Sequence, residues 1–176
     1  GVAWAGATVK IGFLNDATGP IAVYGPGFVA ASQIAVGLAN TIGYSNGVQF
    51  EIVYADSGCD GTMGGTAGQA LVDAGVCGVV GAACSGASMG ANALLSAAGI
   101  PMISSASTSP ALSFATAHPH FYRIVPRDAL QGQAVADMIA ASGVSNTAVI
   151  HKTNSYGAGL VDSAVAKLGA DHGRNQ

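Results

Sequence analysis

The chain has 176 residues, of which 50% are hydrophobic and only 9% are charged, so it can bury one core, or one core and part of another. Its net charge is −3 and its six lysines and arginines are scattered from Lys10 to Arg174, which excludes the clustered cations of nucleic-acid binding. No unbroken apolar run reaches the 18 residues of a membrane span, and the first residues lack a leader, so we expect any signal peptide to have been removed.

In chain order, short apolar segments alternate with helical ones. The predicted extended segments are 9–14, 50–55, 78–82, 101–104, 121–125 and 147–151. The predicted helices are 25–40, 62–74, 88–98, 128–141 and 159–168. Asp128 is expected to be the N-cap of the fourth helix, and the run 75–80 predicts that Cys77 is a buried, inert thiol. Strict alternation predicts an α/β fold with a doubly wound parallel sheet.

The alternation divides the chain into two parts. Residues 1–120 are expected to form one lobe, which ends in a crossover at 118–120. Residues 121–176 are expected to start a second α/β lobe. Two strand–helix units cannot cover both faces of a sheet, so we expect this second lobe to be incomplete at residue 176.

Cys59 and Cys84 each follow a predicted strand, and the carboxyl ends of parallel strands meet at one edge of a sheet. A disulfide between them would close a loop of about 25 residues and stabilise the fold by about 3 kcal/mol. Three free thiols in a cytosolic protein explain the spacing equally well, so the residues alone leave both possibilities open.

Open parallel sheets bind ligands beyond the carboxyl ends of their strands, which nominates the loops 15–24, 56–61, 84–88 and 105–109. Two of these, around Ser85 and Thr108, offer hydroxyls and backbone N–H groups just before helices, where anions are attracted. Because these loops contain no Arg or Lys, the anion is expected to be a carboxylate. Ordinary N-capping by Ser and Thr is the alternative explanation of each loop.

One motif favours an enzyme instead. Residues 86–90 fit the nucleophile elbow G-x-S-x-G, with Ser88 as the nucleophile of a serine hydrolase. The pattern arises easily by chance in a chain rich in Gly and Ser, and Ser88 lies several residues after the predicted strand end. The histidines His118, His120, His151 and His172 are more readily explained as surface or crossover residues. No metal-ligand spacing or cofactor motif is present.

Several segments, taken together, resemble the periplasmic substrate-binding proteins of the leucine/isoleucine/valine-binding type, which serve ABC importers. The segments that carry the resemblance are Lys10-Ile11-Gly12, Thr18-Gly19-Pro20 with the residues to Gly25, 54–60, 81–85, 101–110 and Ser155-Tyr156-Gly157-Ala158-Gly159. They run in the family's order from about residue 9 to residue 168.

The resemblance implies a two-lobed, hinged receptor that passes an amino acid to the membrane subunits of an ABC transporter and needs no cofactor. It implies a disulfide between Cys59 and Cys84, and hence the periplasm, an oxidising compartment. It also implies that Ser85 and Thr108 hold the ligand carboxylate. The other ligand-binding residues are then Ala106, whose carbonyl accepts from the ammonium, Ser107 beside it, Tyr24 in the side-chain pocket, and Tyr156, which closes from the second lobe.

The chain departs from the family in two respects. The family's second lobe is about twice as long as residues 121–176, and the acidic residue that pairs with the ammonium lies in the part not seen here. The helices 25–40 and 62–74 lack the outward charges that the family carries. Charge-poor surfaces favour contact with another chain, so a structural or assembly subunit remains a second hypothesis.

Overall fold

The structure is a computed structural model and describes residues 7–43 and 47–172. Its elements alternate between strands and helices as the sequence predicts, up to the fifth strand. In chain order they are β1 (Ala7–Asn15), η1 (Ala22–Tyr24), α1 (Gly25–Gly43), β2 (Val48–Asp56), α2 (Gly61–Asp73), β3 (Gly78–Val80), α3 (Ser85–Ala97), β4 (Met102–Ser104), η3 (Pro110–Ser113), β5 (Phe121–Arg123), α4 (Asp128–Ala141) and α5 (Ser155–His172).

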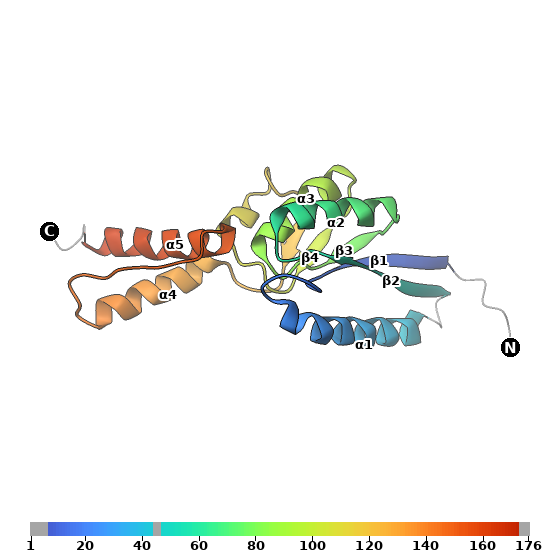
Figure 1. Cartoon of the computed structure of the whole chain (residues 1–176), viewed down its shortest axis with the longest axis horizontal. Coiled ribbons are helices and arrows are strands. Elements are labelled where there is room, and N and C mark those ends of the chain that lie inside the picture. The colour runs from blue at the N-terminus through green and yellow to red at the C-terminus, as the bar shows by residue number, and fades with distance from the viewer. Residues whose placement is uncertain (1–6, 44–46, 173–176) are drawn as a thin grey trace.

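The five strands form one parallel sheet in the order β2-β1-β3-β4-β5. Helix α1 lies on one face, and α2 and α3 lie side by side on the other (Figure 1). The predicted α/β fold with helices on both faces of a parallel sheet is therefore confirmed. The sheet continues through Arg123, three residues past the boundary placed at residue 120, and the division into lobes stays a prediction.

The core lies between the sheet and the pair α2–α3. Leu14, Val79 and Met102 point to this side and are almost fully buried. They meet Leu71 of α2 and Leu95 of α3, which are 1% and 0% exposed. This packing fixes the start of α3 directly beyond the ends of β1 and β3.

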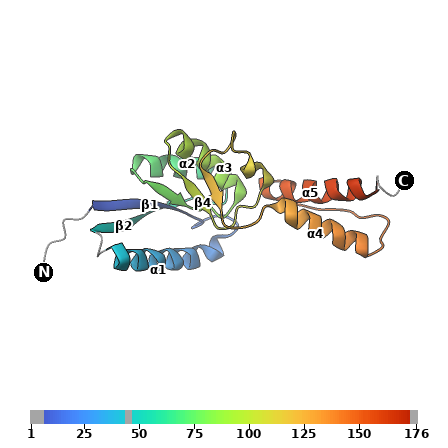
Figure 2. The same cartoon turned by 180° about the vertical axis from the view of Figure 1, so that it is seen from behind.

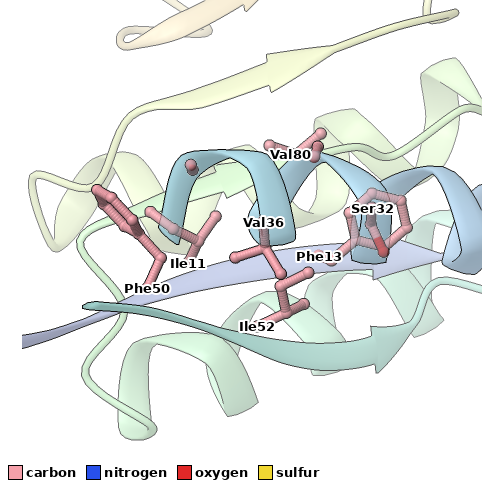
Figure 3. Close-up of a pocket in the computed structure, with 9 residues that line it drawn as sticks. Ile11, Phe13, Ser32, Val36, Phe50, Ile52 and Val80 are labelled. Carbon is pink, nitrogen blue, oxygen red and sulfur yellow. The ribbon is translucent and has the colours of Figure 1, made fainter. Parts of the chain in front are cut away.

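The opposite face of the sheet is covered only in part. Helix α1 leaves an apolar gap of about 280 Å³ above Ile11, Phe13 and Val80 (Figure 3). A row of large side chains crosses all five strands in register on this face: Tyr54, Phe13, Val80, Ile103 and Tyr122. Val80, Ile103 and Tyr122 are 37%, 40% and 57% exposed, so this face is open above β3, β4 and β5.

The segment Ala22–Ile42 is long and apolar enough to cross a membrane, by length and composition only. No membrane span was predicted from the sequence. One side of this segment is hydrogen-bonded to strand β2, because the Ser32 hydroxyl and the Tyr54 hydroxyl lie 2.9 Å apart. The Asn40 side chain also donates to the carbonyl of Phe50 at 3.0 Å and accepts from its N–H at 2.6 Å. We therefore interpret α1 as a layer on the sheet.

Helices α4 and α5 both run outward from the sheet, and the segment between them returns alongside (Figures 1 and 2). They pack closely where Gly132 meets Ser163 and Ala164. The predicted strand 147–151 is wrong, because this segment is irregular and every residue from 141 to 156 is exposed. A strand needs a neighbouring strand for its hydrogen bonds, and none of the described strands lies beside it.

Two predictions about single residues are also wrong. Cys77 is exposed, because it precedes β3 at the sheet's amino edge, where no helix covers it. Arg127 has the N-cap geometry of α4, and Asp128 is the first helical residue. Asp128 is fully buried instead of capping the helix from the surface.

Candidate functional site

The carboxyl ends of the strands open onto one cavity of about 1090 Å³. It lies between the loops of the sheet and the start of α5, so that both predicted lobes contribute to it. Its lining includes Tyr24, Phe28, Asp60, Ser85, Ala106, Thr108, Gln131, Lys152, Asn154 and Tyr156. A cleft of this size at the carboxyl edge of a parallel sheet is the usual place for a small-molecule ligand.

Of the six residues predicted to contact a ligand, the structure brings five around this cavity. They are Ser85, Ala106, Thr108, Tyr24 and Tyr156. Tyr24 stacks on Phe28 with ring centroids 6.3 Å apart, and this pair forms an aromatic wall. The hydroxyl of Thr108 is buried and makes no well-formed hydrogen bond among the described residues, although the Asp128 carboxyl lies close enough to interact with it. An unpaired buried hydroxyl at a cavity is a group that a polar ligand can satisfy.

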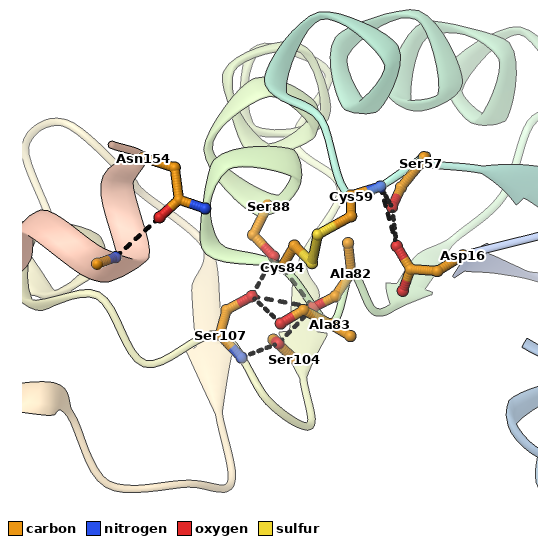
Figure 4. Close-up of a disulfide and its surroundings, with 12 residues drawn as sticks. Asp16, Ser57, Cys59, Ala82, Ala83, Cys84, Ser88, Ser104, Ser107 and Asn154 are labelled. Atoms are coloured by element: carbon orange, nitrogen blue, oxygen red, sulfur yellow. Dashed lines mark hydrogen bonds between the residues drawn. A yellow bond between two sulfur atoms is a disulfide. The ribbon is translucent and has the colours of Figure 1, made fainter. Parts of the chain in front are cut away.

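The sixth residue, Ser107, faces the interior and does not line the cavity. Its hydroxyl donates to the carbonyls of Ala82 at 3.0 Å and Ala83 at 3.2 Å, and lies 2.8 Å from the Ser88 hydroxyl (Figure 4). Ser104 also donates to the Ala82 carbonyl, at 2.6 Å. The buried serines thus tie the loop after β4 to the loop after β3, which turns Ala106 and Thr108 outward.

The N-termini of the two adjacent helices differ in their capping. The carboxylate of Asp60 caps α2 by accepting from the N–H groups of Thr62 at 2.8 Å and Met63 at 3.0 Å. Helix α3 starts at Ser85 without a side-chain cap. The Ser85 hydroxyl accepts from the N–H of Ser109 at 3.2 Å, and nothing among the described residues accepts its proton. An anion at the start of α3 would therefore meet open amides and a free hydroxyl.

A disulfide joins Cys59 and Cys84, which are 25 residues apart in sequence, with their Cα atoms at 5.1 Å. It confirms the pairing implied by the family resemblance. Cys84 is the residue just before α3, and Cys59 lies just before α2. The bond therefore fixes the two helix starts relative to each other at the wall of the cavity (Figure 4).

We expect reduction of this disulfide to destabilise the chain by about 3 kcal/mol, because it releases a loop of 25 residues in the unfolded state. Thermal unfolding with and without a reductant measures this. Cys77→Ser is the matched control, since Cys77 is free and exposed. A Cys59→Ser chain as stable as the Cys77→Ser chain would contradict the structural role.

Two aspartates fix the loops that carry the cavity wall. Burial favours a higher pKa for Asp56, but hydrogen bonds from Thr18, Gly58 and Ala17 outweigh it and hold that pKa below its ordinary value. Asp56 thereby anchors the loop that leads to Tyr24. Asp16 is fully buried, and its Oδ1 accepts from the Ser57 hydroxyl at 2.7 Å and the Cys59 N–H at 3.1 Å. Burial raises the pKa of Asp16, and these two hydrogen bonds offset the increase only in part.

The raised pKa of Asp16 predicts a pH-dependent stability. The contribution of Asp16 to the free energy of unfolding is complete when the pH is below the unfolded-state pKa of its carboxyl. This contribution is lost as the pH rises through the folded-state pKa. Asp16→Asn removes this loss, so we expect the variant to gain stability relative to wild type as the pH rises above the ordinary aspartate pKa of about 4. Urea unfolding of both chains at a series of pH values on either side of that pKa measures the difference.

Asp16→Ala is the companion variant, because it removes the acceptor of Ser57 and Cys59 at every pH and should cost about 1–3 kcal/mol. If the difference in unfolding free energy between wild type and Asp16→Asn does not change with pH, the buried Asp16 carboxyl is not the source of the pH dependence.

Ser88, the candidate hydrolase nucleophile, is fully buried in the first turn of α3. Its hydroxyl bonds to the Ala82 carbonyl at 3.2 Å and to the Ser107 hydroxyl. No histidine is among these hydrogen-bond partners in the described part of the chain. The residue is therefore out of reach of an ester substrate and serves the buried serine cluster.

Several polar residues at the cavity were not predicted from the sequence. Lys152 and Asn154 lie at the end of the irregular segment between α4 and α5, Gln131 comes from α4, and Asp60 precedes α2. Asn154 also caps α5 by accepting from the N–H of Gly157 at 2.8 Å. Lys152 gives the cavity a cation, which the loops of the sheet lack. Lys152 directly follows the predicted strand 147–151, so its place at a predicted strand end was the signal for it in the sequence.

Comparison with known proteins gives consistent results. The family model described as "Receptor family ligand binding region" matches residues 29–174. A leucine-, isoleucine-, valine-, threonine- and alanine-binding protein of Pseudomonas aeruginosa is 31% identical over 87% of this chain and 41% of its own length. A Leu/Ile/Val-binding protein homologue of Brucella melitensis is 29% identical over 92% of this chain and 44% of its own.

Solved structures have the same fold. A leucine-binding protein from Thermotoga maritima superposes with a TM-score of 0.74 at 22% identity, over 92% of this chain and 46% of that chain. An ABC transporter substrate-binding protein from Desulfitobacterium hafniense, in complex with Leu, has a TM-score of 0.66 at 28% identity, over 93% and 47%. The chain thus spans less than half the length of these relatives.

Proposed function

Because the chain belongs to the family of receptor ligand-binding regions and is a relative of the leucine/isoleucine/valine-binding proteins, we propose that it binds a free amino acid by its carboxylate. The observation that carries the proposal is the position of Ser85 and Thr108. They come from two neighbouring strand ends and line one cavity beside the uncapped start of α3. The relatives are named as binding proteins, and this chain likewise does no covalent chemistry on its ligand.

In this proposal the hydroxyls of Ser85 and Thr108 donate to the ligand carboxylate, next to the positive end of the α3 dipole. The Ala106 carbonyl accepts from the ammonium group. Tyr24, stacked on Phe28, contacts the ligand side chain. Tyr156 at the start of α5 approaches from the opposite wall, so a ligand that touches both walls favours closure.

The same proposal extends to location and partners. The Cys59–Cys84 disulfide favours an oxidising compartment such as the periplasm. The structural relative from Desulfitobacterium hafniense is described as an ABC transporter substrate-binding protein. We therefore propose that the ligand is passed to the membrane subunits of an ABC importer.

Calorimetric titration tests the proposal. The purified chain is titrated with L-leucine, L-isoleucine, L-valine, L-threonine and L-alanine, and with L-leucinamide, which lacks the carboxylate. We expect saturable binding of one or more amino acids and none of the amide of a bound one. Equal binding of L-leucine and L-leucinamide would contradict the carboxylate site, and no binding across the panel would contradict the function.

A second candidate function is assembly with further copies of the chain. The open apolar row on the α1 face favours it, because exposed apolar patches of this kind mark contact surfaces. Sedimentation of the purified chain tests this, with Ile103→Lys at the centre of the row as the variant. A wild-type chain that sediments as a monomer contradicts assembly, and one that Ile103→Lys converts from oligomer to monomer supports it.

A further inference from the structure

Three consecutive carbonyl groups of the loop after β4 are held from the two ends of the connection between β5 and α4. The Arg123 guanidinium, at the end of β5, donates to the carbonyls of Ser107 at 3.3 Å and Ser109 at 2.9 Å. It also donates to the hydroxyl of Ser113. The N–H of Asp128, the first residue of α4, donates to the carbonyl of Thr108 at 2.8 Å. The backbone on both sides of the Thr108 side chain is therefore fixed.

We propose that Arg123 is a positioning residue that holds the loop after β4 so that Ala106 and Thr108 face the ligand cavity. The inference rests on the proposed function. Arg123 does not itself line the cavity, so it acts through the loop and not on the ligand. Arginine suits this task because its rigid planar fork donates several hydrogen bonds at once, which the single ammonium of lysine cannot do.

The charge of Arg123 has a second effect at the same place. Asp128 is fully buried, and neither of its carboxylate oxygens has a hydrogen-bond partner among the described residues. Burial raises the pKa of Asp128. The Thr108 hydroxyl, which is near the carboxyl without reaching good hydrogen-bond geometry, and the charge of the Arg123 guanidinium act against this rise. An isolated buried carboxylate is costly, so the positive charge of Arg123 helps the start of α4 to stay beside the loop.

Arg123 and Asp128 bracket the residues 124–127 that connect the sheet to α4. Both hold the carbonyls of residues 107–109. A ligand that contacts Thr108 is therefore connected, through the hydrogen bonds of Arg123 and Asp128, to the segment 124–127 between β5 and α4. Such connections are where hinged proteins change their backbone angles.

The test compares Arg123→Ala, Arg123→Lys and the control Arg127→Ala by titration with the amino acid that binds wild type best, beginning with L-leucine. Arg127 is exposed and makes no side-chain cap. We expect Arg123→Ala to weaken binding by about 10-fold or more, since it removes two hydrogen bonds to the loop and one to Ser113 of η3. Arg123→Lys should restore part of the affinity, and Arg127→Ala should stay within about 2-fold of wild type.

Amide hydrogen exchange supplies a readout that needs no ligand. In Arg123→Ala, the amides of Ser109 and Asp128 should exchange faster than in wild type, while those of the core helices α2 and α3 keep their protection. Unchanged affinity together with unchanged exchange at these two amides would overturn the proposal. The proposal would also be overturned if Arg123→Ala lost affinity together with exchange protection across the whole chain, and if Arg123→Lys did not restore the affinity. A wild-type chain that binds no amino acid would reject the proposed function, while the exchange experiment still tests the positioning of the loop.

Discussion

Gly90→Ala should destabilise the chain by about 3 kcal/mol, because no space exists for a side chain where α3 crosses α2. A Cβ on Gly90 would lie 2.0 Å from the carbonyl oxygen of Gly61 and 3.0 Å from the nitrogen of Gly65. On the facing helix, a Cβ on Gly64 would lie 2.4 Å from the carbonyl oxygen of Ala87. Both obstacles are backbone atoms that cannot rotate away, so the helices must separate.

Gly37→Ala is the matched control, because Gly37 is also inside a helix, α1, but has nothing within 4 Å of its Cβ position. There the substitution should stabilise the chain by about 1 kcal/mol through helix propensity alone. Urea unfolding measures the change in unfolding free energy of each variant from the shift of its midpoint concentration, with the same dependence on urea concentration assumed for all chains. Equal shifts for the two substitutions would show that the helix contact does not require glycine.

These glycines also show where sequence reasoning about the fold is reliable. Propensity alone treats Gly64 and Gly68 as defects in the helix 62–74, yet they are the contact surface of α2 with α3. The helix was still predicted, because the alternation of strands and helices outweighs single residues. The helix 128–141 was predicted with the bounds that the structure has.

The wrong predictions concern properties that depend on neighbours far away in sequence. Residues 147–151 have the composition of a strand, but a strand exists only beside another strand. Cys77 lies in an apolar run, but whether a run is buried depends on which helices cover it. Asp128 has the residue type of an N-cap, but its side chain faces Thr108 and Arg123. None of these partners is visible from local sequence.

The candidate site was predictable to the level of loops, but less so at the level of side chains. Strand ends on one sheet edge must converge, which located the loops of Ser85 and Thr108. The run 105–109 is almost uniformly small and polar, so its composition cannot tell which side chains face outward. The structure alternates them, with Ser107 and Ser109 buried and Ala106 exposed. Ser107 is turned inward because the carbonyls of Ala82 and Ala83 accept from its hydroxyl, and the Ser109 N–H donates to the Ser85 hydroxyl.

Ser85→Ala and Thr108→Ala should each weaken amino-acid binding by about 10- to 100-fold without unfolding the chain. A hydrogen bond to a charged group contributes about 1.5–3 kcal/mol, and each 1.4 kcal/mol is a factor of ten in the dissociation constant. Both hydroxyls would donate to one carboxylate. The double variant should therefore lose less binding free energy than the two single variants lose together. Calorimetric titration of the single and double variants measures the coupling.

Thr66→Ala is the control, since Thr66 carries the same hydroxyl on the exposed side of α2 and bonds only to its own helix, at the Thr62 carbonyl. Its affinity should match wild type. Ser107→Ala is the more searching comparison, because its hydroxyl holds the carbonyls of Ala82 and Ala83 and not the ligand. It should lower the unfolding free energy by about 1–3 kcal/mol. Ser85→Ala removes only the 3.2 Å acceptor of the Ser109 N–H, so its loss of affinity should be large relative to its smaller loss of stability. If Ser85→Ala and Ser107→Ala shift affinity and stability in the same ratio, the two serines share one structural role and the carboxylate must bind elsewhere.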